Sequence, residues 1–231
     1  MSPVKWRSRH SQADTLGLIV DNPRSMAAEA YRTLRTNVQF YNVAEPMRRL
    51  LFTSATPREG KSITAANLAI AFAQADKKVI IIDADLRRPN LHRIFQISNQ
   101  VGLTDVLLGT SDLASTLVST VVPGLLVLPA GPLPPNPAEM LGSPRMRGLL
   151  DELNKEADLV IIDSPPVVIV TDAAVLAPLA DGVILVVAAG EVNREVVQQA
   201  KSQLEAVRAR VLGIVLNGVE DKAKSHDSYY Y

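Results

Sequence analysis

The sequence predicts a three-layer α/β/α fold built on a mostly parallel central sheet. Short runs of Val, Ile and Leu recur along the chain, and longer amphipathic stretches separate them. Continuous apolar runs are typical of parallel strands covered on both faces, and the helices between them supply the crossovers. A length of 231 residues with 47% hydrophobic side chains is enough for one large domain of this kind.

The bounds of each element follow from this pattern. Residues 1–22 are polar and irregular and are expected to form a flexible arm, and a helix then begins at Pro23 or Ser25 and runs to about Tyr41. The expected strands are Arg49–Ser54, Lys78–Asp83, Leu125–Pro129, Leu159–Asp163, Val183–Ala188 and Val211–Asn217. The expected helices between them are Ser62–Ala75, Ser143–Glu156, Asp172–Leu179 and Asn193–Val207. Residues 220–231 are expected to be a disordered tail, which leaves residues 23–219 as the folded domain.

Composition and charge exclude several classes of function. The 24 Lys and Arg residues balance 24 Asp and Glu residues, so no nucleic-acid partner is expected from bulk positive charge. The sequence has no cysteine, which excludes disulfides, thiolate metal sites and cysteine nucleophiles in it. Residues 113–138 are uncharged, but repeated prolines favour a strand followed by a loop over a membrane span.

A phosphate-binding loop is predicted between the first strand and the helix that follows it. The segment Ala55-Thr-Pro-Arg-Glu-Gly60-Lys61-Ser62 matches the P-loop pattern, except that Ala55 replaces its first glycine. Lys61 can reach the β- and γ-phosphates of a nucleotide, and the Ser62 hydroxyl can bind Mg²⁺. The alternative is a tight turn that happens to contain Gly-Lys-Ser. The residues expected to bind the nucleotide here are Thr56, Pro57, Arg58, Glu59, Gly60, Lys61, Ser62 and Ile63.

Three aspartates stand at the ends of buried strands. Asp83 and Asp85 belong to an Asp-x-Asp-x-Arg sequence that closes the second strand, and Asp163 closes the strand Leu159–Asp163. Ligands of open parallel sheets bind outside the carboxyl ends of the strands, so the three carboxylates are expected to converge near Lys61. They would repel one another unless a cation joined them, and Mg²⁺ fits this role. Aspartate also begins turns and caps helices, but that does not explain the combination with a P-loop.

Together, the motifs resemble those of one family. The P-loop Ala55–Ser62, the acidic motif Ile80–Arg87 and the Ile161–Pro166 motif are similar to those of the bacterial tyrosine kinases of capsular and exopolysaccharide synthesis. This family resembles the partitioning and septum-site ATPases in fold. The resemblance covers roughly residues 25–220. It implies a P-loop NTPase fold, ATP and Mg²⁺ as cofactors, and transfer of the γ-phosphate to tyrosine.

The resemblance also implies a role for each motif residue. Lys61 would stabilise the transferred phosphoryl group, and Asp83 would act as the base or position the acceptor hydroxyl. Arg87 would contact phosphate or hold its own loop. The residues that would organise Mg²⁺ are Ser62, Asp85 and Asp163.

Two further polar residues have alternative roles. Asn217 stands where related ATPases recognise adenine with an amide, although Asn followed by Gly218 is also an ordinary turn. Asp172 could cap its helix or join the outer shell of the metal, and the cap is favoured.

Two features at the ends of the domain support the resemblance. Glu29, Arg32 and Arg35 fit the family's E-x-x-R-x-x-R motif, which makes subunit contacts in a ring, although residues three apart on a helix can also pair within it. The tail ends in Tyr229–Tyr231, three of the five tyrosines of the chain. In the family, such a cluster is autophosphorylated, usually by a neighbouring subunit.

The resemblance finally implies a membrane activator of the polysaccharide co-polymerase type. The protein would then lie in the cytoplasm at the inner face of the cell membrane, either as a stand-alone kinase or as the excised domain of a fused one. Other protein tyrosines would be further substrates. A partitioning-type ATPase is the main alternative, but its second P-loop lysine corresponds to Thr56 here. A non-catalytic scaffold for polysaccharide export is the other alternative, against which the intact motifs argue.

Overall fold

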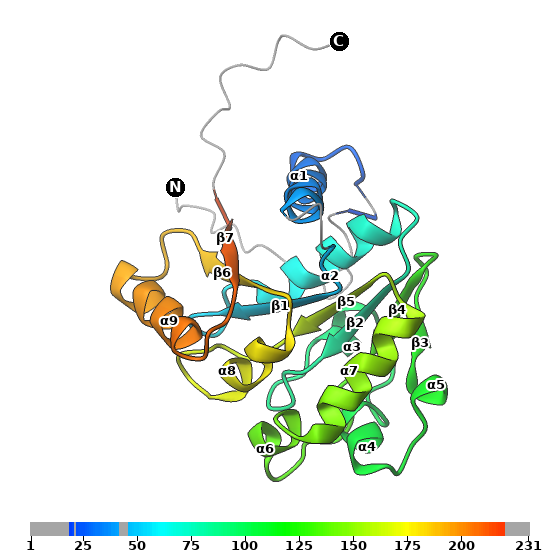
Figure 1. Cartoon of the computed structure of the whole chain (residues 1–231). Helices are drawn as coiled ribbons and strands as arrows, with labels where there is room; N and C mark the ends of the chain where they lie inside the picture. The colour runs from blue at the N-terminus through cyan, green and yellow to red at the C-terminus, as the bar shows by residue number, and fades with distance from the viewer. Residues whose placement is uncertain (1–18, 21, 42–45, 220–231) are drawn as a thin grey trace, which may run out of the picture.

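A seven-stranded sheet forms the centre of the molecule, in the order β3-β4-β2-β5-β1-β6-β7 (Figure 1). The structure is a computed structural model, and it describes residues 19–20, 22–41 and 46–219. Neighbouring strands pair in parallel, except β3, which is antiparallel to β4. The predicted mostly parallel sheet is therefore confirmed. Its strands are β1 (Arg49–Ser54), β2 (Val79–Asp83), β3 (Val118–Ser119), β4 (Leu125–Leu128), β5 (Leu159–Asp163), β6 (Gly182–Ala188) and β7 (Val211–Asn217).

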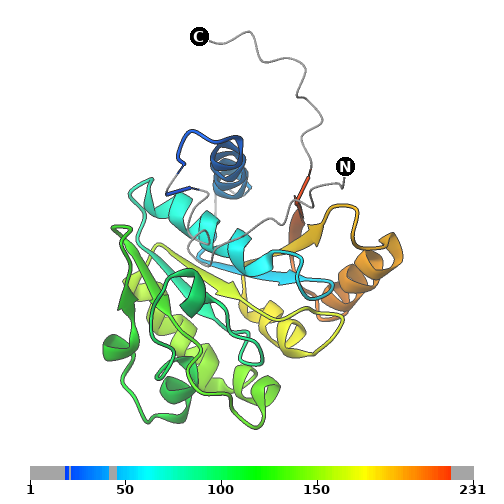
Figure 2. The same ribbon diagram turned by 180° about the vertical axis from the view of Figure 1, so that it is seen from behind.

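Helices cover both faces of the sheet and complete the predicted three layers (Figure 1 and Figure 2). One face carries α1 (Met26–Phe40), α2 (Lys61–Ala73) and α3 (Leu91–Ile94). The other carries α4 (Leu103–Leu108), α5 (Leu113–Thr116), α6 (Pro137–Leu141), α7 (Pro144–Glu156), α8 (Asp172–Leu176) and α9 (Arg194–Ala206), and the 3-10 turn Ala177–Leu179 continues α8. Each face has its own core, and alternate residues of one strand serve both: Ile81 packs into the first core and Ile82 into the second.

The long elements agree with the sequence pattern, and the short ones were not predicted. All six predicted strands are confirmed within one residue of the observed bounds. β3 and the helices α3 to α6 are missing from the prediction because two to six residues are too few for a periodic signal. The stretch 113–138, predicted as a strand and a loop, also contains α5, whose first turn is capped by Asp112 through the Ala114 N–H at 3.1 Å.

The first helix is anchored at its start and along one face. Ser25 caps α1, and its hydroxyl oxygen accepts a hydrogen bond from the Ala28 N–H at 3.1 Å. Ala28 and Val38 are buried against the core on the α2 side of the sheet. Ile19, which lies in the stretch predicted as a flexible arm, is only 1% exposed and joins the same core. The rest of that arm, residues 1–18, and the tail 220–231 lie outside the described residues.

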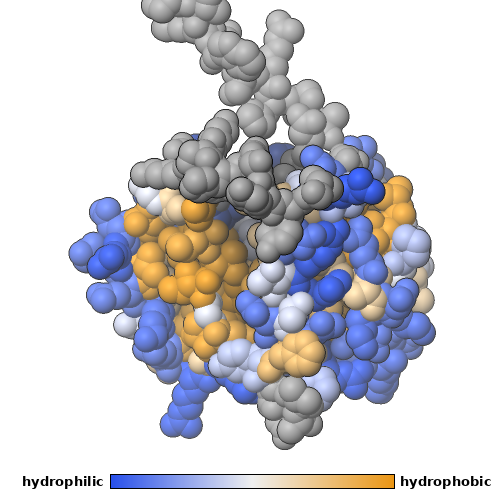
Figure 3. Space-filling view, turned by 90° about the horizontal axis from the view of Figure 1, so that it is seen from above, coloured by the Kyte–Doolittle hydropathy of each residue, from blue (hydrophilic) through white to orange (hydrophobic). Residues whose placement is uncertain are grey.

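The edge strand β7 leaves part of the sheet open to solvent. Figure 3 shows an apolar patch on the β6–β7 side of the molecule. Its exposed members in and after β7 are Ile214, Leu216 and Val219, each more than half exposed. Within the described part of the chain, no helix is long and apolar enough to cross a membrane.

Candidate active site

The three central strands bring the predicted motifs together. β5 lies between β2 and β1, and Asp83 at the end of β2 is the register partner of Asp163 at the end of β5. The P-loop leaves the neighbouring end of β1 and leads into α2, which begins at Lys61. The expected convergence of Lys61, Asp83, Asp85 and Asp163 at one edge of the sheet is therefore observed.

The P-loop takes a conformation that requires its glycine. Gly60 has φ of +81°, and Arg58 two residues earlier also lies in the left-handed region at φ +69°. A Cβ atom at position 60 would lie 1.8 Å from the Asn217 Nδ2 atom, so only glycine fits. Alternating backbone turns of this kind aim successive N–H groups at an anion, as does the start of α2.

Side chains from the loop itself and from β7 fix the shape of the P-loop. Glu59 is buried, and its carboxylate accepts hydrogen bonds from the Thr56 N–H, from the Thr56 hydroxyl at 2.9 Å and from the Ala188 N–H at 3.2 Å. The Asn217 amide donates to the Glu59 carbonyl at 3.1 Å. These side chains tie the P-loop to the ends of β6 and β7. The prediction that Thr56, Glu59 and Asn217 bind the nucleotide did not include this role.

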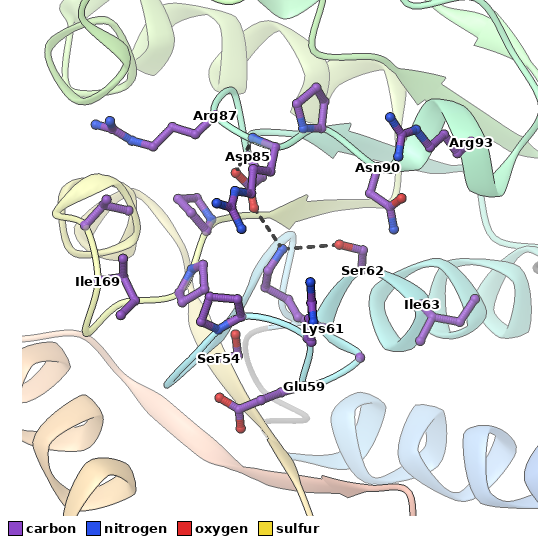
Figure 4. Close-up of a pocket in the computed structure, with 18 of the residues that line it drawn as sticks. Ser54, Glu59, Lys61, Ser62, Ile63, Asp85, Arg87, Asn90, Arg93 and Ile169 are labelled. Atoms are coloured by element: carbon purple, nitrogen blue, oxygen red, sulfur yellow. Dashed lines mark hydrogen bonds and ion pairs between the residues drawn. The ribbon is translucent and has the colours of Figure 1, made fainter. Parts of the chain in front are cut away.

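Lys61 is the centre of the charge network. Its Nζ atom lies 2.7 Å from Asp163 Oδ1, 3.6 Å from Asp85 Oδ2 and 3.2 Å from the Ser62 hydroxyl oxygen. Figure 4 shows Lys61 pointing toward Asp85 and Ser62. Burial alone would lower the pKa of Lys61, but the charges of Asp163 and Asp85 outweigh it and raise this pKa. The ammonium group therefore stays protonated.

The carboxylates behind Lys61 are strongly perturbed. Burial, reinforced by the charge on Asp163, raises the pKa of Asp83 to about 8. Asp83 Oδ2 accepts hydrogen bonds from the Asn90 and Leu91 N–H groups, both at 2.9 Å, whereas its Oδ1 atom is buried and has no partner in the described part of the chain. Asp163 Oδ2 is likewise buried and has no partner among those residues. Burial also raises the pKa of Asp85, against the opposing effect of Lys61.

The unpaired oxygens fit a magnesium ion. A buried carboxylate oxygen without a donor is costly, and a cation would satisfy it. Among the residues described, no group of three or more His, Asp or Glu side chains could hold a metal by itself. That is the usual situation for Mg²⁺, which takes one or two carboxylates and completes its shell with water and nucleotide phosphates. Asp163, Asp85 and the Ser62 hydroxyl are the side chains present for it.

A deep pocket opens over these groups. It has a volume of about 1150 Å³. The predicted residues that line it are Pro57, Arg58, Glu59, Gly60, Lys61, Ser62, Ile63, Asp85 and Arg87. Thr56, Asp83, Asp163 and Asn217 lie behind this surface or beside it. Pro166 of the Ile161–Pro166 motif also lines it, as do residues that the sequence did not single out: Arg88, Asn90, His92, Arg93 and Ile169.

Arg87 is held by a partner that the sequence did not reveal. Its Nε and Nη2 atoms lie 2.9 and 3.0 Å from the two carboxylate oxygens of Asp172. The Asp172 side chain is fully buried, whereas that of Arg87 is 41% exposed and points away from Lys61 (Figure 4). Thr171, not Asp172, stands at the cap position of α8, so the preferred role of Asp172 as a cap is wrong. Of the two roles predicted for Arg87, the contacts favour the one that holds its loop.

The E-x-x-R-x-x-R motif divides between two faces of α1. Glu29 pairs with Arg32 within the helix, and both remain accessible. Arg35 lies on the inner side, where its Nη1 atom donates to the Ala71 carbonyl of α2 at 3.0 Å. Tyr229, Tyr230 and Tyr231 lie outside the described residues.

Comparison with known proteins finds a P-loop NTPase family model and two tyrosine-protein kinases. A family model described as ParA, NUBPL iron-transfer P-loop NTPase, matches residues 49–228. The tyrosine-protein kinase YwqD of Bacillus subtilis (strain 168) is 43% identical over 225 residues, which cover 97% of this chain and 94% of YwqD. The tyrosine-protein kinase Etk of Escherichia coli (strain K12) is 39% identical over 223 residues, which cover 96% of this chain but 31% of Etk.

Solved structures agree with these relatives. The crystal structure of the chimerical protein CapA2B2 superposes with a TM-score of 0.87 at 38% identity, and the match covers 90% of this chain and 91% of that one. Cobyrinic acid a,c-diamide synthase from Mycobacterium smegmatis, solved with ADP and magnesium, has a TM-score of 0.63 at 23% identity over 73% of each chain. At that identity, the likeness concerns the fold alone.

Proposed function

The chain belongs to the bacterial tyrosine-protein kinases, and from this premise we propose that it transfers the γ-phosphate of ATP to its own C-terminal tyrosines. The observation that carries the proposal is the contact of Lys61 with Asp163 and Asp85 under a phosphate-binding loop. Autophosphorylation of Tyr229–Tyr231 in a neighbouring copy is the reaction proposed. Regulation of capsular or exopolysaccharide synthesis is the proposed outcome.

The site residues are proposed to share the work as follows. The P-loop N–H groups and the start of α2 bind the phosphates. Lys61 stabilises the negative charge of the transferred phosphoryl group. Ser62, Asp163 and Asp85 would hold Mg²⁺, which when bound neutralises the β- and γ-phosphate oxygens. The unpaired Oδ1 atom of Asp83 is available to accept the proton of the acceptor hydroxyl. With a pKa of about 8, Asp83 would accept this proton in its ionised form, and the share of that form grows as the pH rises toward 8.

Assembly and membrane recruitment belong to the same proposal. Met26 and Phe40 are exposed on α1, 74% and 68% respectively, on the side that also presents Glu29. Apolar side chains next to charged ones on an accessible helix support a subunit contact there, in a ring. The match covers less than a third of Etk, so in that relative other parts of the chain accompany the kinase. A membrane activator, separate or fused, would place this chain at the inner face of the cell membrane.

Two other functions are less well supported. A partitioning-type switch would hydrolyse ATP without forming phosphotyrosine. The solved structures of McdA and of the septum site-determining protein MinD are 21% and 23% identical to this chain, so they support a common fold and no more. The family description names iron transfer, but clusters of iron and sulfur are held mainly by cysteine thiolates and this sequence has no cysteine.

A mixing experiment tests the kinase proposal. The Lys61→Met chain keeps its tail but is expected to lose transfer, and a chain with Tyr229–Tyr231 replaced by Phe keeps its active site but has no acceptor cluster. Incubated together with Mg²⁺ and ATP, they should yield phosphotyrosine on the Lys61→Met tail, read by mass spectrometry. Lys61→Met alone should give none.

Two further readouts complete the test. ATP hydrolysis without phosphotyrosine in any mixture would refute the kinase proposal and favour the switch. Because Lys61→Met leaves the buried Asp163 without its cation, Ser62→Ala serves as a second inactive acceptor that keeps this pair.

A further inference from the structure

Three arginines that line the pocket have no acidic partner among the described residues. Arg58, Arg88 and Arg93 are exposed, and in the described part of the chain no carboxylate lies within ion-pair distance of them. Arg87, by contrast, is neutralised by Asp172. Unpaired guanidinium groups on a concave surface attract anions and can bind carboxylate or phosphate with two hydrogen bonds.

These arginines lie on two walls of the pocket. Arg58 belongs to the P-loop, so the phosphates of the nucleotide account for it. Arg88 and Arg93 come instead from the stretch that follows β2: Arg88 lies in the loop that contains Asp85, and Arg93 lies in α3. Figure 4 shows Arg93 beside Asn90, on the side of Asp85 and across the pocket from the P-loop residues Lys61 and Glu59. The acceptor hydroxyl must approach the γ-phosphate from the side away from the rest of the nucleotide.

The segment that carries them is fixed to the acidic motif. The Arg88 N–H donates to Asp85 Oδ1 at 3.0 Å, and the Asn90 and Leu91 N–H groups donate to Asp83 Oδ2. These hydrogen bonds fix the backbone that carries the two arginines in position relative to Asp83 and Asp85. Such preorganisation gives orientation at low entropic cost.

Space and charge allow a second ligand beside the nucleotide. The volume of about 1150 Å³ exceeds the range of roughly 300–1000 Å³ that is usual for a small-molecule site. His92, between the two arginines in sequence, has a pKa lowered by burial and by the charge of Arg93, so at neutral pH it adds no charge. The anion attraction on this wall thus comes from Arg88 and Arg93.

We propose that Arg88 and Arg93 form an anion-binding subsite for the acceptor peptide, so that the preferred substrates are tyrosines flanked by carboxylate or phosphotyrosine groups. This inference rests on the proposed kinase function and names its substrate class. The tail sequence fits it, because Asp227 stands two residues before Tyr229. Each phosphotyrosine would add a charge of about −1.5 to −2 beside the remaining tyrosines.

The test uses the mixing assay with two acceptors. The Lys61→Met chain and the Lys61→Met/Asp227→Asn chain are each phosphorylated by the kinase in which Phe replaces Tyr229–Tyr231, and the ratio of the two rates is the readout. One charge-assisted hydrogen bond pair predicts a ratio of about tenfold in favour of Asp227. In a kinase that also carries Arg88→Gln and Arg93→Gln, the ratio should fall close to one. Because a ratio is measured, a general loss of activity cancels.

A matched control and the phosphotyrosine arm sharpen the result. Arg147→Gln, an exposed arginine on α7 away from the pocket, should leave the ratio unchanged. With a kinase that keeps Arg88 and Arg93, the second phosphate should be added to a tail faster than the first. Arg88→Gln/Arg93→Gln in the kinase should remove this acceleration.

The overturning results are distinct. A ratio near one with the unmodified arginines would refute the subsite for carboxylates, and no acceleration would refute it for phosphotyrosine. If Arg88→Gln/Arg93→Gln raises the KM for ATP and leaves the ratio intact, the two arginines serve the nucleotide instead. Absence of phosphotyrosine on every acceptor would refute the kinase function itself.

Discussion

Asp83 shows how one residue can be unfavourable for folding and still useful for chemistry. It is fully buried, one of its oxygens has no partner among the described residues, and burial with the charge of Asp163 raises its pKa to about 8. The folded state therefore holds a proton on the buried Asp83–Asp163 pair. The unfolded state releases the same proton above about pH 4. The unfolding free energy must then fall as pH rises from about 4 to about 8.

Asp83→Asn should remove this pH dependence. The amide has no carboxyl proton to lose, so the variant should gain stability over the natural chain as the pH is raised. We expect the difference in unfolding free energy, measured by urea titration without nucleotide, to grow by at least about 1 kcal/mol between pH 5 and pH 8. Phosphotransfer should be lost at both pH values.

A matched variant isolates this effect. Glu152→Gln, which removes an exposed carboxylate on α7 for which no ion pair is found among the described residues, is the control measured beside it. A pH-independent difference for Asp83→Asn would mean that the buried pair does not hold a proton in this range.

At the scale of elements, a salt bridge joins two loops that carry the site. Arg87 follows β2 and Asp172 begins α8, so their bidentate pair connects the loop of the acidic motif to the loop after β5. Asp172 is fully buried, whereas the Arg87 side chain is 41% exposed. Removing the cation leaves a buried carboxylate unpaired, whereas changing the carboxylate to an amide keeps most of the contacts.

The two halves of this pair should therefore differ in their effect. Arg87→Met is expected to lower the unfolding free energy by about 3 kcal/mol, and Asp172→Asn by about 1 kcal/mol. Lys201→Met, which breaks the exposed pair with Glu205 on α9, should cost no more than about 0.5 kcal/mol. Urea unfolding of the three variants gives the order. If Arg87→Met and Lys201→Met lower the unfolding free energy equally, the pairing of Arg87 with the buried Asp172 does not stabilise the fold.

The same loops show where sequence reasoning ends. Lys61, Asp83 and Asp163 were predictable because each follows a long apolar strand, and parallel strands end at one edge of the sheet. The partner of Arg87 stands 85 residues away, and no local pattern links the two. Glu59 fits the P-loop by position, yet its buried bonds to Thr56 and Ala188 depend on where β6 lies. The weak available signal was a lone aspartate, Asp172, within an apolar stretch.

At the scale of the whole molecule, the proposed transfer depends on how copies of the chain meet. The last described strand, β7, ends at Asn217, which donates to the Glu59 carbonyl of the P-loop at the rim of the pocket. Transfer to a neighbouring copy requires that copies meet, and α1 presents Glu29 with the exposed Met26 and Phe40 for such a contact. Arg35, on the inner side of the same helix, also bonds to α2 in its own chain through its Nη1 atom.

Glu29→Arg should therefore disrupt assembly and transfer together. It replaces an exposed acid with a base beside Arg32 and costs the helix only about 0.5 kcal/mol, so the fold should be kept. Mass photometry is expected to show smaller species, and phosphorylation of a Lys61→Met acceptor should slow at low protein concentration and recover at high concentration. Glu205→Arg on α9, which also breaks an exposed intrahelical pair, should leave both unchanged. If the species keep their size while transfer slows, α1 acts on the acceptor and not on assembly.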